Sequence, residues 1–181
     1  MTLMDIAHFL VDPELLQRYG WRMLEGLGIT ARLVALSFFL GAALGMLLAM
    51  ARLSRNPVLR HAAGAYIYVL RGTPLLAQLF LLYYGLGSLR EVWQEVGLWW
   101  LFRDAWYCAV LAFTLNTAAY QAEIFRASLQ AIPQGQFEAA QALGLRRLPT
   151  FFKVTLPQSL MIAVGPLGNE LILLIKASAI A

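Results

Sequence analysis

Charge-free apolar stretches alternate with short polar segments along this chain. Four such stretches occur, at residues 33–51, 72–89, 105–122 and 154–175, the last one interrupted by Glu170. A helix needs about 20 apolar residues to cross the roughly 30 Å hydrocarbon core of a bilayer. Buried helices of a soluble fold would carry polar faces that these stretches lack. The pattern therefore predicts four membrane-spanning helices.

The segment before the first stretch, residues 1–31, has helix signals of its own. Asp12 can cap a helix that has Pro13 at its first position, and apolar side chains then recur every four residues. This pattern predicts a short helix lying on the membrane surface. Gly41 and Gly45, four residues apart in the first span, are small enough to let another helix approach closely.

The composition agrees with a membrane protein and argues against several other classes. Hydrophobic residues make up 60% of the chain and charged residues 13%, with a mean hydropathy of +0.65, whereas a soluble domain has about 25% charged residues. The single cysteine, Cys108, gives neither a disulfide framework nor a metal-binding spacing. The chain contains no P-loop, HExxH or CxxC pattern, so we expect it to have no bound cofactor, no metal site and no catalytic residue.

The basic residues are distributed by loop rather than gathered in one patch, which argues against nucleic acid as a partner. The loop between the second and third spans mixes both signs of charge, whereas the loops on either side of it are basic. Their basic side chains are Arg52, Arg55 and Arg60 in the first loop, and Arg126, Arg146, Arg147 and Lys153 in the last. By the positive-inside rule the two basic loops lie in the cytoplasm, so the N-terminus and residues 1–31 lie outside, in the periplasm.

A polar, turn-broken stretch at about residues 133–157 separates the third span from the fourth. Gln136–Leu143 favours a helix, and Gly144 stands where a left-handed C-terminal cap is needed. Pro149 can begin the next helix, and Pro157 is expected to kink it. A helix this short is not stable unaided in water, so it must lie against lipid or another protein. Its narrow face of small residues favours a groove in another protein.

The same stretch resembles the EAA motif of ABC-importer permeases. It reads Glu138-Ala139-Ala140, three residues, Gly144, nine residues, Val154, one residue and Leu156-Pro157, with valine where the consensus has isoleucine. Three further segments are similar to the polar amino-acid branch of that family, and most of all to its histidine, lysine, arginine and opine permeases. They are RGTPLLAQLF from Arg71, NTAAYQAEIFRASLQAIPQGQ from Asn116 and GNELILLIK from Gly168.

The resemblance implies a fold, a function and partners. The fold would be that of an ABC type I importer permease, an all-α polytopic membrane protein, with residues 32–181 as its transmembrane permease domain. The chain would be the membrane-spanning subunit of an ATP-driven importer for polar, basic amino acids or opines in the bacterial inner membrane. Its partners would be a second permease subunit, identical or similar, a periplasmic substrate-binding protein and a cytoplasmic dimer of ABC ATPases that binds ATP and Mg.

The resemblance also assigns residues to coupling with the ATPase. They are Glu138, Ala139, Ala140, Gly144, Leu156 and Pro157. The first two would contact the ATPase, the glycine would permit the turn, and the last two would tie the turn to the fourth span. Family members usually have a fifth span and a cytoplasmic tail. Since this chain stops at Ala181, we expect that it is truncated or lacks a helix.

An acidic residue inside a membrane helix is costly and marks either a pathway or a partner. Glu170, which follows Asn169 in the fourth span, can face a translocation path and meet a cationic substrate group. It can equally pair with Arg71 or Lys176, or lie at the membrane interface. Further polar candidates for the path, each of which can instead form a helix–helix hydrogen bond, are Asn116, Thr117, Tyr120 and Gln78.

The start of the second span is a candidate gate. Thr73 and Pro74 follow Arg71 and can break the helix near its cytoplasmic side. A broken helix frees backbone groups for a ligand. Arg71 can alternatively extend its guanidinium to the lipid headgroups.

A function of another class is also open at this point. Four apolar helices would equally suit an ATP-independent membrane protein, either a channel or a structural subunit of a membrane complex. The EAA resemblance favours the importer.

Overall fold

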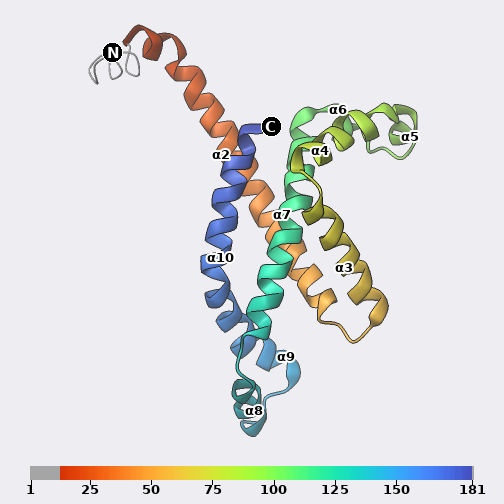
Figure 1. Cartoon of the computed structure of the whole chain (residues 1–181), viewed down its shortest axis with the longest axis vertical. Coiled ribbons are helices and arrows are strands. Elements are labelled where there is room, and N and C mark those ends of the chain that lie inside the picture. Colours follow the sequence, from red (N-terminus) through yellow and green to blue (C-terminus); the bar gives the residue numbers. More distant parts are fainter. Residues whose placement is uncertain (1–12, 181) are drawn as a thin grey trace.

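The structure, a computed structural model, describes residues 13–180, and every regular element in that range is helical. Three long helices, α2 (Pro13–Arg52), α7 (Ala105–Gln130) and α10 (Leu156–Ala177), pack against one another, and α3 (Pro57–Gly72) leans on the same bundle (Figure 1). The all-α prediction is therefore confirmed for the described residues.

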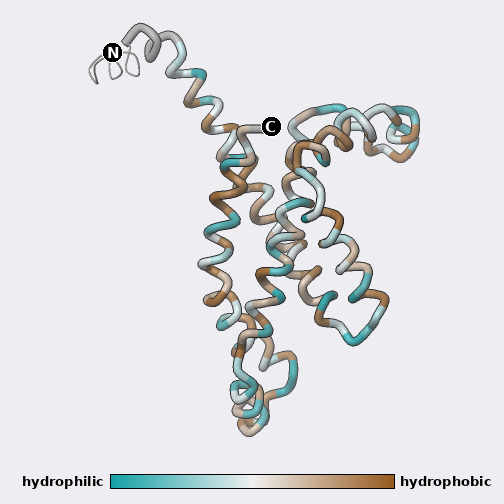
Figure 2. The backbone as a smooth tube through the Cα atoms, in the orientation of Figure 1, coloured by the Kyte–Doolittle hydropathy of each residue, from teal (hydrophilic) through white to brown (hydrophobic). Residues whose placement is uncertain are grey.

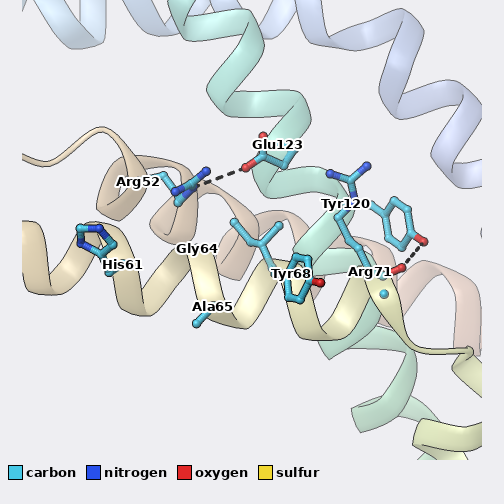
Figure 3. Close-up of a pocket in the computed structure, with 10 residues that line it drawn as sticks. Arg52, His61, Gly64, Ala65, Tyr68, Arg71, Tyr120 and Glu123 are labelled. Carbon is cyan, nitrogen blue, oxygen red and sulfur yellow. Dashed lines mark hydrogen bonds and ion pairs between the residues drawn. The ribbon is translucent and has the colours of Figure 1, made fainter.

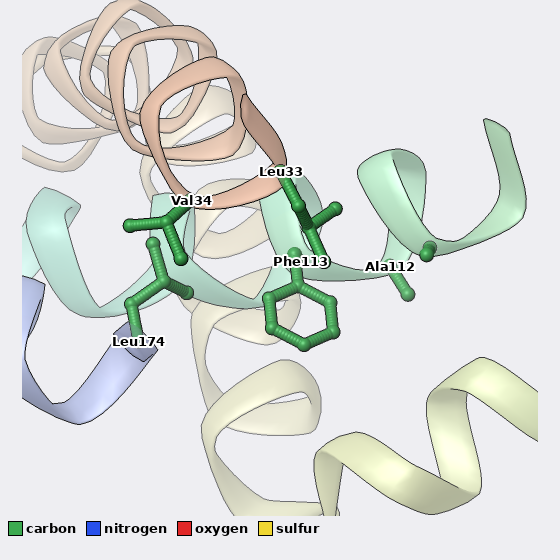
Figure 4. Close-up of a cluster of buried hydrophobic side chains, with 6 residues drawn as sticks. Leu33, Val34, Ala112, Phe113 and Leu174 are labelled. Atoms are coloured by element: carbon green, nitrogen blue, oxygen red, sulfur yellow. The ribbon is translucent and has the colours of Figure 1, made fainter. Parts of the chain in front are cut away.

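α7 is the central helix of the bundle, because α2, α3 and α10 all pack on it. Most of its buried side chains are small or aromatic, and Phe113 is only 1% exposed. Phe113 and Ala112 of α7 meet Leu33 and Val34 of α2 and Leu174 of α10 in one apolar cluster (Figure 4). The first, third and fourth predicted spans thus share a single core.

Small residues allow α2 and α7 to approach closely. A Cβ atom on Gly45 would lie 3.0 Å from the carbonyl oxygen of Ala118 and 3.1 Å from the backbone nitrogen of Ala122, while one on Gly41 would collide with the Thr117 side chain. Real Cβ atoms rarely come so near to backbone, so only glycine fits at this crossing. The prediction that Gly41 and Gly45 admit another helix is confirmed.

Length and hydropathy single out two helices of the described chain as able to cross a membrane, Tyr19–Arg52 and Arg147–Ala177, and a bent pair as a possible third. α7 is not among them, although the sequence predicts a span at 105–122. Its polar residues lower its hydropathy, yet Thr117 and Gln121 are fully buried against neighbouring helices. A central helix can carry such residues because protein, not lipid, surrounds it.

Hydrophobic residues recur along the long helices (Figure 2), and many of their large apolar side chains are exposed. Trp21 and Phe39 on α2 are 73% and 72% exposed, and Met161 on α10 is 78% exposed. Apolar surface on this scale is typical of proteins that contact lipid or a further protein subunit. It agrees with the membrane location that the composition predicts.

The first helix is longer than expected. Residues 13–31 and the first span form one continuous helix, α2, rather than a separate surface helix followed by a span. None of the glycines in this segment ends the helix, and no proline interrupts it. The predicted cap, Asp12, lies outside the described residues.

The second span is not one helix over 72–89, and that prediction is wrong. α3 ends at Gly72, Thr73 is extended, and the chain resumes as α4 (Leu75–Phe80), η1 (Leu81–Gly85) and η2 (Leu86–Ser88) after a bend of 105°. Pro74 has no N–H for a helical bond and disfavours helix at the residue before it. Beyond the bend, α5 (Arg90–Glu95) and α6 (Trp99–Arg103) form an arm that leads back to α7 (Figure 1).

Both short helices of the polar stretch start at earlier residues than predicted. α8 (Gln134–Ala142) starts two residues before Gln136, and α9 (Arg147–Thr150) begins at Arg147, so Pro149 is not its first residue. A π-helical turn, η3 (Phe151–Thr155), then precedes Pro157 in α10. π-helical turns accommodate an irregularity in the hydrogen-bond ladder, such as the missing N–H of a proline. Arg147–Ala177 therefore remains one helical path of 31 residues.

Replacing Gly45 with leucine tests the α2–α7 crossing. We expect Gly45→Leu to destabilise the protein by about 1–3 kcal/mol, because the added side chain must force the two backbones apart. Thermal unfolding of the purified protein in detergent measures the effect. Gly28→Leu on the same helix is the matched control, since nothing lies within 4 Å of a Cβ there. Equal melting temperatures for the two variants would show that the crossing is not close-packed.

Candidate functional site

The stretch that resembles the EAA motif folds as two short helices joined by a tight turn. Gly144 follows α8 with a φ of +74°, the left-handed conformation that the sequence predicts for it. The N–H of Gly144 donates to the carbonyl oxygen of Gln141 at 2.9 Å, and the N–H of Leu145 donates to that of Ala140 at 3.0 Å. These two bonds form a Schellman motif, which satisfies the last carbonyl groups of a helix.

This turn is anchored on one face and open on the other. Ala140 is 3% exposed, and Nε2 of Gln158 on α10 donates to Oε1 of Gln136 on α8 at 3.3 Å. Glu138 and Ala139 are exposed. α8 and α9 lie at the opposite end of the bundle from the C-terminus, beyond the ends of the long helices (Figure 1). The open face is therefore free to contact another protein.

The last two residues of the motif stand where the turn joins the long helix. Leu156 and Pro157 open α10 directly after the π-helical turn. Leu156 is half-buried, and its carbonyl oxygen accepts a hydrogen bond from the Ser159 hydroxyl at 2.9 Å. A displacement of the turn would consequently reach α10 without an intervening loop.

Side-chain hydrogen bonds stabilise the break in the second span. Nε2 of Gln78 donates to the carbonyl oxygens of Leu70 and Thr73, at 2.8 and 3.1 Å, and to Oγ1 of Thr73 at 2.8 Å. Nδ2 of Asn116 on α7 donates to Oε1 of Gln78 and again to the carbonyl oxygen of Leu70, both at 3.2 Å. The Thr73 hydroxyl donates to the carbonyl oxygen of Val69 at 2.9 Å. Backbone acceptors that the break releases are thus satisfied within the protein, as an apolar surrounding requires.

The break lies beside Asn116, near the middle of α7. Its role as a gate stays a prediction. The prediction took Arg71 as the start of the second span. Because α3 already begins at Pro57, Arg71 stands at the end of a helix of 16 residues instead. A small apolar cavity of about 290 Å³ adjoins the break, with Thr73 and Gln78 in its wall.

Glu170 is 7% exposed and lies between α10 and α7. Its Oε1 accepts a hydrogen bond from the Thr117 hydroxyl at 2.9 Å, and that hydroxyl accepts one from Nε2 of Gln121 at 3.3 Å. Among residues 19–179, whose side chains the structure describes, Glu170 forms no ion pair, neither with Arg71 nor with Lys176. Its neighbour Asn169 is exposed. Glu170 is therefore an interior acid whose charge no described cation offsets by direct contact.

A cavity of about 730 Å³ opens between α3 and α7 and contains Arg71 and Tyr120 (Figure 3). The Arg71 guanidinium lies 5.0 Å from the centre of the Tyr120 ring, and the Tyr120 hydroxyl donates to the carbonyl oxygen of Arg71 at 3.5 Å. Two charged residues to which the sequence assigns no place in the path, Arg52 and Glu123, also line this cavity. Glu123 falls one helical turn after Tyr120, and that spacing is the signal that could have found it.

The candidate path residues therefore separate into three groups. Asn116 and Tyr120 on α7 face α3, whereas Thr117 between them faces α10. The groups are Asn116 with Gln78 and Thr73, Thr117 with Glu170, and Tyr120 with Arg71. Across the described chain no three His, Cys, Asp or Glu residues come together as a metal site.

A helical bundle with an apolar exterior, a broken span and an exposed two-helix turn is typical of a membrane-embedded permease. The chain belongs to the family described as the inner membrane component of binding-protein-dependent transport systems, whose sequence model matches residues 41–181. The resemblance that the EAA motif suggests is thereby confirmed.

Individual relatives agree with this assignment. The chain is 41% identical to the nopaline transport system permease protein NocM of Agrobacterium fabrum, over 94% of this chain and 71% of that protein. It is 37% identical to the histidine/lysine/arginine/ornithine transport system permease protein HisM of Escherichia coli K12, over 99% of this chain and 74% of that protein. These relatives are permease subunits of ABC importers, and none supports the ATP-independent alternative.

Solved structures share the fold. An amino acid ABC transporter crystallised with histidines superimposes with a TM-score of 0.75 at 35% identity, covering 91% of this chain and 72% of that one. An inward-facing MetNI methionine transporter gives a TM-score of 0.71 at 23% identity, covering 90% of this chain and 74% of that one, which supports the fold alone. The chain is a permease subunit of an ABC importer, a class of subunit that does not itself hydrolyse ATP.

Proposed function

We propose that ATP hydrolysis in a separate cytoplasmic ATPase dimer drives this permease through the α8 turn. The observation that carries the proposal is the exposed pair Glu138 and Ala139 on a helix whose opposite face is anchored. A helix of nine residues is too short to be stable alone, so a surface groove of a partner would complete its packing. ATP and Mg belong to that partner, and this chain binds neither.

The geometry supplies a route from the turn to the membrane helices. α8 follows α7 after a short linker at residues 131–133, and α9 leads through the π-helical turn into α10. A push on α8 therefore acts on α7 and α10 together. These two helices hold the buried Thr117–Glu170 hydrogen bond, so relative movement of the helices would act directly on Glu170.

The proposed cargo is a polar, basic amino acid or an opine. Relatives named for nopaline, octopine, arginine and histidine/lysine/arginine/ornithine transport support this class. Glu170 supports it on physical grounds, because a buried carboxylate without a cation is stabilised by a substrate ammonium or guanidinium. In this proposal Asn169, Asn116, Thr117, Tyr120 and Gln78 contribute to the path, and the break at Arg71, Thr73 and Pro74 acts as its gate.

The proposed arrangement in the membrane follows from charge. The basic α2–α3 turn and the α8 turn lie in the cytoplasm, and residues 1–31 and the α5–α6 arm lie in the periplasm, where a substrate-binding protein delivers the cargo. A second permease subunit, identical or similar, covers part of the apolar exterior. The membrane is the bacterial inner membrane, which agrees with the family description.

Substitution of Gly144 tests the coupling role. We expect Gly144→Asp to insert and assemble normally but to reduce uptake at least about tenfold while ATP hydrolysis continues, because a side chain at φ > 0 strains the turn by about 1–2 kcal/mol and adds charge to its open face. Uptake and ATP hydrolysis are measured together in proteoliposomes that contain the complete transporter.

Gly97→Asp is the matched control for this variant. Gly97 also has a positive φ, +72°, but lies after α5 on the arm at the other end of the bundle. It experiences the same backbone strain and should keep uptake coupled to hydrolysis. Normal transport by Gly144→Asp would remove the α8 turn from the coupling route.

Substitution of Glu170 tests the cargo class. We expect Glu170→Gln to lower uptake of a basic substrate by about 10- to 100-fold, equivalent to loss of a charge-assisted bond of about 1.5–3 kcal/mol. The amide keeps the acceptor for Thr117, so assembly should be normal. Glu91→Gln on α5 is the control and should transport like the parent. Unchanged uptake by Glu170→Gln would exclude Glu170 from the path.

A further inference from the structure

Gln121 is a fully buried polar side chain of α7, at the place where this helix crosses α2. Its Nε2 donates to the carbonyl oxygen of Phe38 on α2 and to Oγ1 of Thr117, both at 3.3 Å. Its Oε1 is buried and has no hydrogen-bond partner within the described chain. An unpaired buried oxygen costs free energy, so an apolar side chain of the same size would pack better here. The two N–H donors are therefore what glutamine contributes at this position.

The Phe38 carbonyl group determines which way the Gln121 amide is turned. A carbonyl oxygen only accepts hydrogen bonds, so the amide atom that faces it is the NH2 group and not the amide oxygen. The NH2 group has two hydrogens, and the second one is directed at Oγ1 of Thr117. Thr117 therefore accepts a hydrogen bond from Gln121.

This hydrogen bond in turn determines the direction of the Thr117 hydroxyl. A hydroxyl hydrogen that pointed at Gln121 would meet another donor, so it points to the other neighbour, Oε1 of Glu170, at 2.9 Å. Gln121, Thr117 and Glu170 thus form a network in which each donor faces the carboxylate. Because such hydrogen bonds polarise one another, the donation from Gln121 makes Thr117 a stronger donor to Glu170.

Packing keeps the three side chains of this network in place. α2 approaches α7 so closely that a Cβ atom on Gly45 would lie 3.1 Å from the Cβ atom of Gln121. Phe113 of α7 and Leu174 of α10, each one helical turn from a member of the network, share one buried apolar cluster (Figure 4). Side chains whose own geometry is fixed by packing can hold a binding group in one position.

The second carboxylate oxygen of Glu170, Oε2, is left for a ligand. Thr117 bonds Oε1 alone, and among residues 19–179 Oε2 has no hydrogen-bond partner. Oε2 is also not one of the unpartnered side-chain atoms that are closed off from solvent, so a ligand can reach it. The network therefore presents one accessible carboxylate oxygen in a fixed place, which suits a charge-assisted hydrogen bond from an ammonium or a guanidinium.

We propose that Gln121 is a positioning residue that selects for cationic cargo. By donating to Thr117 it directs the Thr117 hydroxyl to Oε1 of Glu170, and so holds Oε2 where the cationic group of the cargo binds. The proposal rests on the proposed function, in which Glu170 meets that group. Gln121 itself touches no cargo, since its side chain is fully buried and its NH2 group is directed at Phe38 and Thr117.

L-Arginine and L-citrulline test this role, because the two ligands have nearly the same shape and only arginine has a positively charged side chain. We expect Gln121→Met, which keeps the side-chain length but removes both N–H donors, to raise the Kd of arginine about tenfold and to leave that of citrulline nearly unchanged. Both Kd values are measured on the assembled transporter in nanodiscs, without binding protein or ATP. Radiolabelled arginine is the ligand, and citrulline is its competitor.

Two further variants control for effects on folding. Gln130→Met is the matched control, because Gln130 lies exposed at the end of the same helix, and it should bind arginine like the parent. Gln121→Leu is a second variant without N–H donors and should lose arginine affinity as Gln121→Met does. Thermal unfolding of each purified variant in detergent shows that it is folded.

Thr117→Val separates positioning from packing. Valine has the shape of threonine without the hydroxyl, so this variant should also raise the Kd of arginine about tenfold. In the Thr117→Val background Gln121→Met should have almost no further effect, because Gln121 acts through the hydroxyl that is already absent. A residue needed only for packing would instead weaken binding by the same factor in both backgrounds.

Three results would overturn the proposal. They are unchanged arginine binding in both Gln121 variants, equal loss of arginine and citrulline binding, and equal effects of Gln121→Met with and without the Thr117 hydroxyl. Glu170→Gln in the same assay distinguishes this proposal from the proposed function. If Glu170→Gln weakens arginine binding and Gln121→Met does not, the role of Gln121 is wrong and the cargo site stands. If Glu170→Gln leaves arginine binding unchanged, the cargo site itself is wrong.

Discussion

The polar side chains of α7 must find partners inside the protein, because lipid offers none and an unpaired polar group in an apolar surrounding costs several kcal/mol. Asn116 supports the broken second span, Thr117 binds Glu170, and Glu123 binds Arg52 and Arg126. Apart from Arg126, which is on α7 itself, these partners lie on different neighbouring helices. Burying this one helix therefore fixes where α2, α3 and α10 can lie, and the lack of a side chain at Gly45 lets α2 approach α7 closely.

The same arrangement links the turn at one end of the bundle to groups in its interior. α7 and α10 are joined by the α8–α9 turn, and they meet again at the Thr117–Glu170 hydrogen bond. The Schellman cap at Gly144 and the buried Ala140 make the turn a compact unit instead of a flexible loop. A force applied to its open face would move two helices that share one buried carboxylate, which is the physical basis of the proposed coupling.

Local features of the fold could be predicted from the sequence, and contacts between helices could not. The apolar stretches, the left-handed Gly144 and the break at Pro74 depend on residues close in the chain, and the structure contains all three. The length of α3 and the position of the break along α7 depend on contacts between helices. The hydrophobic periodicity of the sequence does not reveal those contacts. Glu123 was missed because it directly follows the third apolar stretch, where the sequence gives no sign of a neighbouring helix. Only the packing of α3 on α7 places it in a cavity with Arg71.

Site-directed crosslinking at Ala139 tests whether the α8 turn contacts an ATPase subunit. Ala139 is exposed on α8, and an Ala139→Cys variant can be joined by a short bifunctional reagent to a cysteine in the surface groove of the ATPase subunit. We expect a permease–ATPase crosslink whose yield changes when ATP is bound, and no labelling of this cysteine from outside intact cells. Labelling from the outside, or a turn that crosslinks to no ATPase in the assembled transporter, would contradict it.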